Sequence, residues 1–127
     1  MISPGEENET VLWKMYMWSA VQAISEEPDA DGVVILRTAQ NREFRFPFFM
    51  NRPTAEWSAH IRNVLIRENS ACIRNLVYVW KNHWLDIPAD DLRKELISLC
   101  PENQNAQIML IGEDGFVIKK LSQICGK

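Results

Sequence analysis

The sequence predicts an α+β fold in which a single antiparallel sheet packs with three helices, in the order α-ββ-α-ββ-α-ββ. Two observations carry this prediction. Three segments have helical patterns, and pairs of strand-like segments joined by short turns separate or follow them. Strands joined by short turns pair antiparallel, and helices between such pairs pack on a face of the sheet. The 127 residues, 1–127, are expected to form one domain, because chains of this length usually build one hydrophobic core.

The first helix is expected over residues 8–25, close to glutamates whose charge suits the positive end of a helix dipole. Its apolar residues cover nearly every face, among them Trp13, Met15, Tyr16, Met17, Trp18, Ala20, Val21 and Ile24. A helix that is apolar all round has to be enclosed on several sides. Because a lone sheet covers only one side, we expect part of this helix to be covered by another chain.

A hairpin over residues 33–49 is expected next, and its second strand alternates strictly. Phe44, Phe46 and Phe48 fall on one face of that strand, which predicts that all three belong to the core. Pro47 has no amide hydrogen to donate, so it places this strand at an edge of the sheet.

The rest of the chain is expected to hold two more helices and two more strand pairs. A helix over residues 54–68 has apolar residues at helical spacing, and a second strand pair follows over 73–87. The continuous apolar run at 76–80 is typical of a strand buried on both faces. A third helix over residues 88–100 and a hairpin over 107–121 complete the prediction.

The side chains that usually carry catalysis or bind metals are few and scattered. The cysteines Cys72, Cys100 and Cys125 have no CxxC spacing and apolar neighbours, so we expect free thiols rather than a disulfide framework. The histidines, His60 and His83, are too far apart in the sequence to form a local metal pair. We therefore expect no catalytic residue, no cofactor and no metal ligand, and favour a non-enzymatic protein.

Location and partner class are also predicted. The N-terminal residues are acidic rather than basic, and the apolar stretch at 11–24 is shorter than the roughly 20 residues of a membrane span. We expect a cytoplasmic protein without membrane contact.

Residues 42–48 alternate basic and aromatic side chains and loosely resemble the base-stacking strand of RNA-recognition domains. The low isoelectric point, about 5.4, argues against RNA or single-stranded DNA as a partner.

The function predicted first is protein–protein interaction, by an accessory subunit, an inhibitor or immunity-like protein, or a homodimeric module. Tryptophan, tyrosine and methionine are enriched in interfaces, and the first helix is rich in them. The candidate interface residues are Trp13, Tyr16, Met17, Trp18, Arg37, Arg45 and Arg52.

The alternative is a small-ligand-binding domain or an enzyme. Its pocket is predicted at the end of the buried strand, because pockets combine aromatic side chains with a few polar ones. The candidate pocket residues are Trp80, His83, Trp84 and Asp86.

Overall fold

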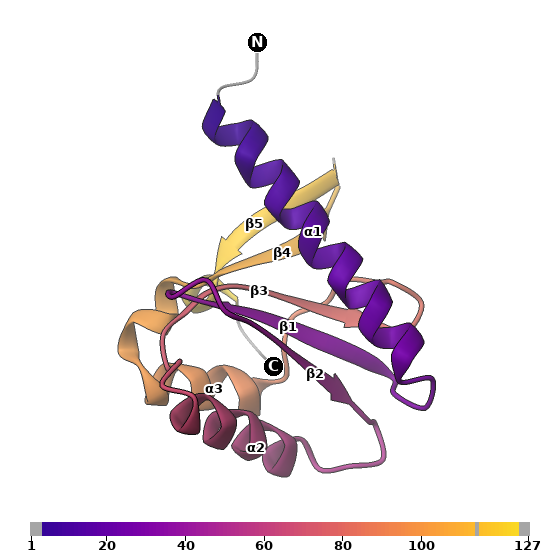
Figure 1. The fold of residues 1–127 in the computed structure, drawn as a ribbon, viewed down its shortest axis with the longest axis vertical. Helices are drawn as coiled ribbons and strands as arrows, with labels where there is room; N and C mark the ends of the chain where they lie inside the picture. The colour runs from indigo at the N-terminus through magenta and orange to yellow at the C-terminus, as the bar shows by residue number, and fades with distance from the viewer. Residues whose placement is uncertain (1–3, 114, 125–127) are drawn as a thin grey trace.

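One five-stranded sheet lies between helices on its two faces (Figure 1). The computed structural model describes residues 4–113 and 115–124. The helices are α1 (Pro4–Glu26), α2 (Thr54–Arg67) and α3 (Asp90–Leu99), with short 3₁₀ helices η1 (Pro101–Asn105) and η2 (Leu121–Gln123). The strands are β1 (Gly32–Thr38), β2 (Glu43–Phe48), β3 (Ile73–Trp80), β4 (Gln107–Gly112) and β5 (Gly115–Lys120), in the order β2-β1-β3-β4-β5. The α+β class with one sheet and three helices is confirmed.

The sheet is mixed, which corrects the expectation of a purely antiparallel one. Strands β3 and β4 run parallel, with Asn75 opposite Gln107 and Leu76 opposite Ile108. The reason is the connection between them. After β3, helix α3 and η1 return the chain to the end of the sheet where β3 began, so β4 runs in the same direction. The other neighbouring strands pair antiparallel.

Residues 83–87 do not form the expected partner strand, and the second strand pair is therefore wrong. Only one isolated bridge joins Val79 to Leu85. His83 takes a left-handed conformation, with φ 69°, so the chain turns sharply after β3. Pro88 follows Ile87 directly and cannot donate a ladder hydrogen bond, so strand pairing ends there.

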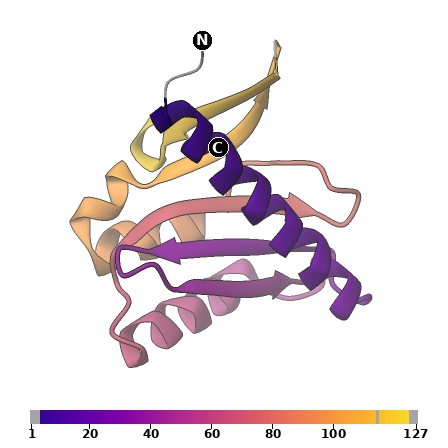
Figure 2. The same cartoon turned by 45° about the horizontal axis from the view of Figure 1, so that its top comes forward.

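Strand β3 is buried on both faces, as its apolar run predicts. Leu76 and Tyr78 belong to a core cluster that includes side chains of α2 and α3. Val77 and Val79 belong to a second cluster, on the opposite face, that includes side chains of α1. Helix α1 therefore lies alone on its side of the sheet among the described helices, as Figure 2 shows.

A helix that crosses a lipid bilayer has to be both long and apolar. Over the described residues, α1 and the other helices all fall short of what a membrane crossing needs.

Ser58 of α2 is fully buried, and its hydroxyl has no hydrogen-bond partner among the described residues. A buried hydroxyl without a partner lowers stability, so we expect Ser58→Ala to raise the free energy of unfolding by about 1 kcal/mol. The matched control is Asn63→Ala at an exposed position of the same helix, where only the gain in helix propensity, about 0.5 kcal/mol, is expected. Urea unfolding of both variants measures the difference. Equal gains would show that the Ser58 hydroxyl carries no penalty.

Candidate functional site

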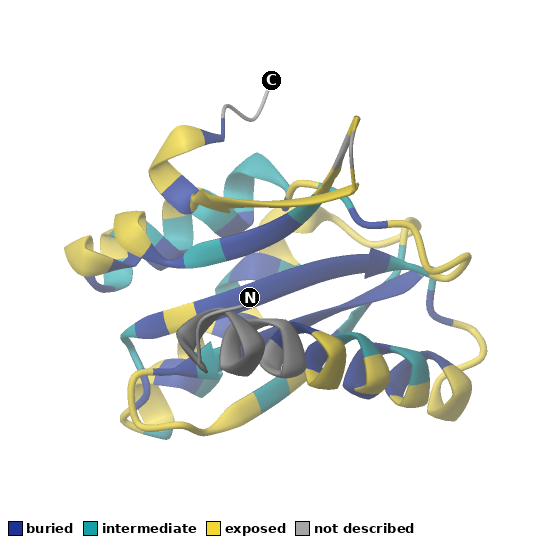
Figure 3. Ribbon diagram, turned by 90° about the horizontal axis from the view of Figure 1, so that it is seen from above, coloured by how far each residue is buried: buried dark blue, intermediate teal, exposed yellow. Residues whose placement is uncertain are grey.

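Helix α1 has one buried face and one exposed face. Trp13 and Tyr16 are 5% and 2% exposed, and they pack edge to face with ring centres 5.1 Å apart. Trp18 is 66% exposed and Met15 is 54% exposed. Residues two apart in an α-helix differ by about 200° around its axis, so Trp18 lies opposite Tyr16 and away from the sheet. The exposed positions alternate with buried ones along the helix in Figure 3.

The buried face of α1 is fixed by a short chain of polar contacts. The Tyr16 hydroxyl donates to the Asn75 side-chain oxygen at 3.1 Å, and the Asn75 amide donates to Gln107 at 3.3 Å. Burial raises the pKa of Tyr16 to about 12, so its hydroxyl stays protonated and remains a donor at neutral pH. This contact sets the rotation of α1, and the rotation directs Met15 and Trp18 to solvent.

The structure gives the four predicted interface residues of α1 different surroundings. Trp13 and Tyr16 belong to the chain's own core, and Met17 is partly buried against that core. Trp18 alone among the four predicted helix residues is largely exposed. The three predicted arginines lie on strands and a loop instead of on α1.

The predicted arginines are not gathered at the exposed side of α1. Arg45 pairs with Glu43 at 3.1 Å, and the Ser19 hydroxyl of α1 donates to the same carboxylate at 3.0 Å. Arg37 lies on β1, directly opposite Glu43. Arg52 lies farther along the chain, over the Phe49 ring at 4.1 Å. Two of the three thus lie on the α1 side of the sheet, beneath the helix rather than on its outer face.

A second exposed apolar surface, which we call the hairpin patch, consists of Ile111, Phe116 and Ile118. Their exposed fractions are 43%, 67% and 37%. Ile118 is paired with Met109, and Met109 belongs to the core under α1. Because paired residues of antiparallel strands point to the same face, the hairpin patch lies on the α1 side of the sheet. The only sequence signal for it is the apolar content of the 107–121 hairpin, which does not distinguish core from surface.

The predicted pocket residues lie near a shallow, open depression of about 450 Å³, lined by Asp31, Trp80, Lys81, Asn82 and Trp84. Trp80 and Trp84 are therefore brought together. His83 lies in the exposed turn outside this lining, and Asp86 accepts a hydrogen bond from the Trp80 indole at 2.9 Å.

Three polar side chains of the depression already have partners within the chain. Lys81 donates to the Pro28 carbonyl at 2.6 Å, and Asp31 accepts from the Met50 amide at 2.7 Å. Asn82 accepts from the Trp84 amide at 3.1 Å. What remains is mainly the face of Trp84, which is 58% exposed. A small ligand would find an aromatic surface there but few free polar groups to orient it.

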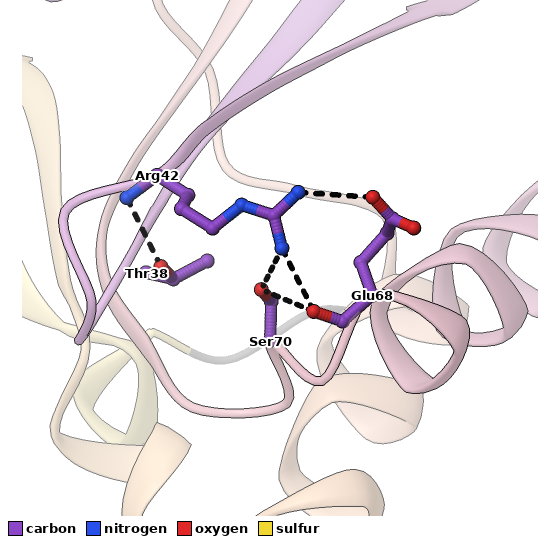
Figure 4. A network of polar contacts seen from close by, with 4 residues as sticks. All are labelled: Thr38, Arg42, Glu68 and Ser70. Atoms are coloured by element: carbon purple, nitrogen blue, oxygen red, sulfur yellow. Dashed lines mark hydrogen bonds and ion pairs between the residues drawn. The ribbon is translucent and has the colours of Figure 1, made fainter.

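The strand at 42–48 uses its aromatic side chains inside the protein. Phe46 and Phe48 are buried in the core with α2, and Phe44 packs against the same core. Arg42 is held by the end of α2: its guanidinium donates to the Glu68 carboxylate at 2.9 Å and to the Glu68 carbonyl at 2.8 Å (Figure 4). The alternation that resembled a base-stacking strand is thus explained by packing.

No family model and no curated protein compared with this sequence matches it.

Proposed function

We propose that the protein is a cytoplasmic protein–protein interaction module without catalysis, which binds its partner through Met15 and Trp18 on the outer face of α1. The observation that carries the proposal is the position of Trp18, on the side of α1 that no described element covers. Helices α2 and α3 pack on the opposite face of the sheet and cannot reach it. Large exposed apolar side chains grouped on one surface are typical of interaction sites.

The hairpin patch is a second apolar surface on the same side of the sheet as α1. A partner broad enough to span that side would contact both. Exposed lysines flank both parts, Lys14 on the helix and Lys120 on β5. Charged residues around an apolar centre resemble the polar rim of a protein interface. A partner with acidic residues around an apolar anchor site fits this arrangement, and a second copy of the chain is the simplest alternative partner.

The expected result of Trp18→Ala is loss of partner binding without loss of folding. Tryptophan anchors at interfaces contribute about 2 kcal/mol or more, so affinity is expected to fall by roughly 30-fold. Stability is expected to change by only about 0.5 kcal/mol, because Trp18 is exposed. The measurement is quantitative mass spectrometry of proteins that the tagged chain retains from its native cells, together with sedimentation of the purified chain at micromolar concentrations.

The matched control is Trp84→Ala, which removes an equally accessible tryptophan from the depression instead of from α1. A partner retained by the wild type and by Trp84→Ala, but lost with Trp18→Ala, supports the proposal. A partner or ligand lost only with Trp84→Ala would favour the alternative, small-ligand site. A monomer that retains the same proteins in all three forms would contradict an interaction role for α1.

A further inference from the structure

Two cysteines that are 28 residues apart in the sequence meet at one end of the sheet. Cys72 directly precedes β3, and Cys100 directly follows α3. Their Sγ atoms lie 2.6 Å apart. Cys100 is buried and Cys72 is half-buried, so one thiol of the pair is accessible from solvent. The predicted free thiols are present, but their proximity has no signal in the sequence. Cys125 lies outside the described residues.

The backbone around both thiols is fixed by a buried asparagine. Asn103 of η1 accepts a hydrogen bond from the Ile73 amide at 2.6 Å and donates to the Ala71 and Leu96 carbonyls, each at 2.8 Å. Ala71 and Ile73 are the neighbours of Cys72, and Leu96 lies one helical turn before Cys100. The fold therefore holds the two sulfur atoms in contact, independently of the thiols themselves.

The separation of the sulfur atoms distinguishes two kinds of chemistry. Two thiolates that bind one tetrahedral zinc ion at about 2.3 Å are roughly 3.8 Å apart, whereas bonded sulfurs are about 2.05 Å apart. The Glu102 carboxylate is near both sulfurs, 3.5 Å from Cys100 and 3.9 Å from Cys72, and could complete a set of three metal ligands. The sulfur atoms, 2.6 Å apart, are closer to the separation of bonded sulfurs than to that of two ligands of one zinc ion.

We propose that Cys72 and Cys100 are a reversible dithiol–disulfide pair that joins the start of β3 to the end of α3 when it is oxidised by a small-molecule disulfide such as oxidised glutathione. The Cys72 thiolate attacks one sulfur of the oxidant, forms a mixed disulfide and releases the first thiol. The Cys100 thiolate then attacks the Cys72 sulfur, closes the protein disulfide and releases the second thiol. The protein loses two electrons and two protons, and the oxidant gains them.

The surroundings set the order of these steps. The hydrogen bond with Cys72, together with burial, raises the pKa of Cys100 to about 11, so Cys100 keeps its proton while Cys72 is a free thiol. Conversion of Cys72 to a mixed disulfide removes that hydrogen bond. The Glu102 carboxylate is close enough to Cys100 to accept its proton as the second attack begins. The accessible Cys72 is therefore the first thiol to react, and the buried Cys100 resolves the mixed disulfide.

The test uses the purified chain, titrated with mixtures of oxidised and reduced glutathione. We expect alkylation of free thiols to show the loss of two thiols, and peptide mapping to show a Cys72–Cys100 link within one chain. Closing a loop of 28 residues is expected to raise the midpoint of thermal unfolding by roughly 10 °C. Addition of reduced glutathione should restore both thiols.

Three variants identify the role of each cysteine. Cys100→Ser is expected to stop at a mixed disulfide with one glutathione on Cys72, Cys72→Ser to form no link, and the matched control Cys125→Ala to behave as the wild type. Mapping of the wild-type chain needs no variant, so it decides the case even if a variant folds poorly. Thiols that stay free in excess oxidant, a link that uses Cys125, or zinc binding that protects both thiols from alkylation would overturn the proposal. None of these results depends on the proposed interaction.

Discussion

Asn103→Ala is expected to lower the free energy of unfolding by about 3 kcal/mol, because it leaves the buried Ile73 amide and the part-buried Ala71 carbonyl without their hydrogen-bond partner. Asn103 is fully buried in η1. Its side chain accepts from the Ile73 amide at 2.6 Å and donates to the carbonyls of Ala71 and Leu96, both at 2.8 Å. The Leu96 carbonyl keeps the Cys100 amide as a donor at 3.2 Å, so two groups are left unpaired. Each donor or acceptor left unpaired costs about 1–3 kcal/mol.

The measurement is urea unfolding, in which the midpoint should fall while the slope stays unchanged. The matched control is Asn105→Ala, two residues along the same 3₁₀ helix, where the side chain is exposed. That variant is expected to change stability by only about 0.5 kcal/mol. A loss below about 1 kcal/mol for Asn103→Ala would show that the Ile73 amide and the Ala71 carbonyl find other partners.

Strands β3 and β2 were predicted correctly because the sequence pattern of each is compatible with only one arrangement of buried faces. In β3, the run at 76–80 is apolar at every position, and the two faces of the strand are buried in two different core clusters. In β2, the alternation of Phe44, Phe46 and Phe48 indicated which face is turned to the core, and that face packs against α2. The local pattern, a continuous run in β3 and an alternation in β2, was sufficient in both cases, because burial of a strand is decided by its own side chains.

The direction of β4 was not predictable, because it depends on where a long connection returns the chain. The expectation of antiparallel pairs relied on a short turn after β3, but residues 83–87 form only a single bridge. Without that partner strand, the crossover through α3 brings β4 alongside β3 in parallel. The parallel ladder is short, limited to pairs at Asn75 and Leu76. No residue of this crossover signals that outcome locally.

The sequence indicated that part of α1 is not covered by the sheet, but it did not indicate which side of the helix that is. The helix has apolar side chains all round, so the sequence does not show whether Tyr16 or Trp18 is turned to the sheet. The hydrogen bond from Tyr16 to Asn75, 59 residues away in the sequence, selects one rotation. The proximity of the two thiols also depends on distant residues, since Cys72 and Cys100 meet through contacts of Asn103. Both features depend on tertiary contacts between distant residues.

Gly32→Ala is expected to lower the free energy of unfolding by about 3 kcal/mol, because the new methyl group would overlap two neighbours in a packed core. A β-carbon on Gly32 would overlap both Cζ of Phe48 and the Val79 carbonyl oxygen. The carbonyl belongs to the backbone of β3, which is paired with β1 and cannot move without breaking the ladder.

The Phe48 ring cannot move aside easily either, since three aromatic side chains hold it. It stacks on Tyr78 with ring centres 4.6 Å apart, and it meets Trp80 and Trp57 edge-on at 5.0 Å and 5.8 Å. A shift of this ring would disturb the whole group, which lies between the sheet and α2. The overlap is therefore expected to appear as lost stability rather than as a small local adjustment.

A double-mutant cycle with Phe48→Leu tests this cause. If the ring is the main obstacle, Phe48→Leu should cost at least about 1 kcal/mol less in the Gly32→Ala background than in the wild type, as measured by urea unfolding. A residual loss that persists in the double variant is attributed to the Val79 carbonyl, which Phe48→Leu does not move. Strict additivity of the two substitutions would show that Gly32 and Phe48 do not contact each other, and that the close approach of β1 to this ring is not the reason for a glycine here.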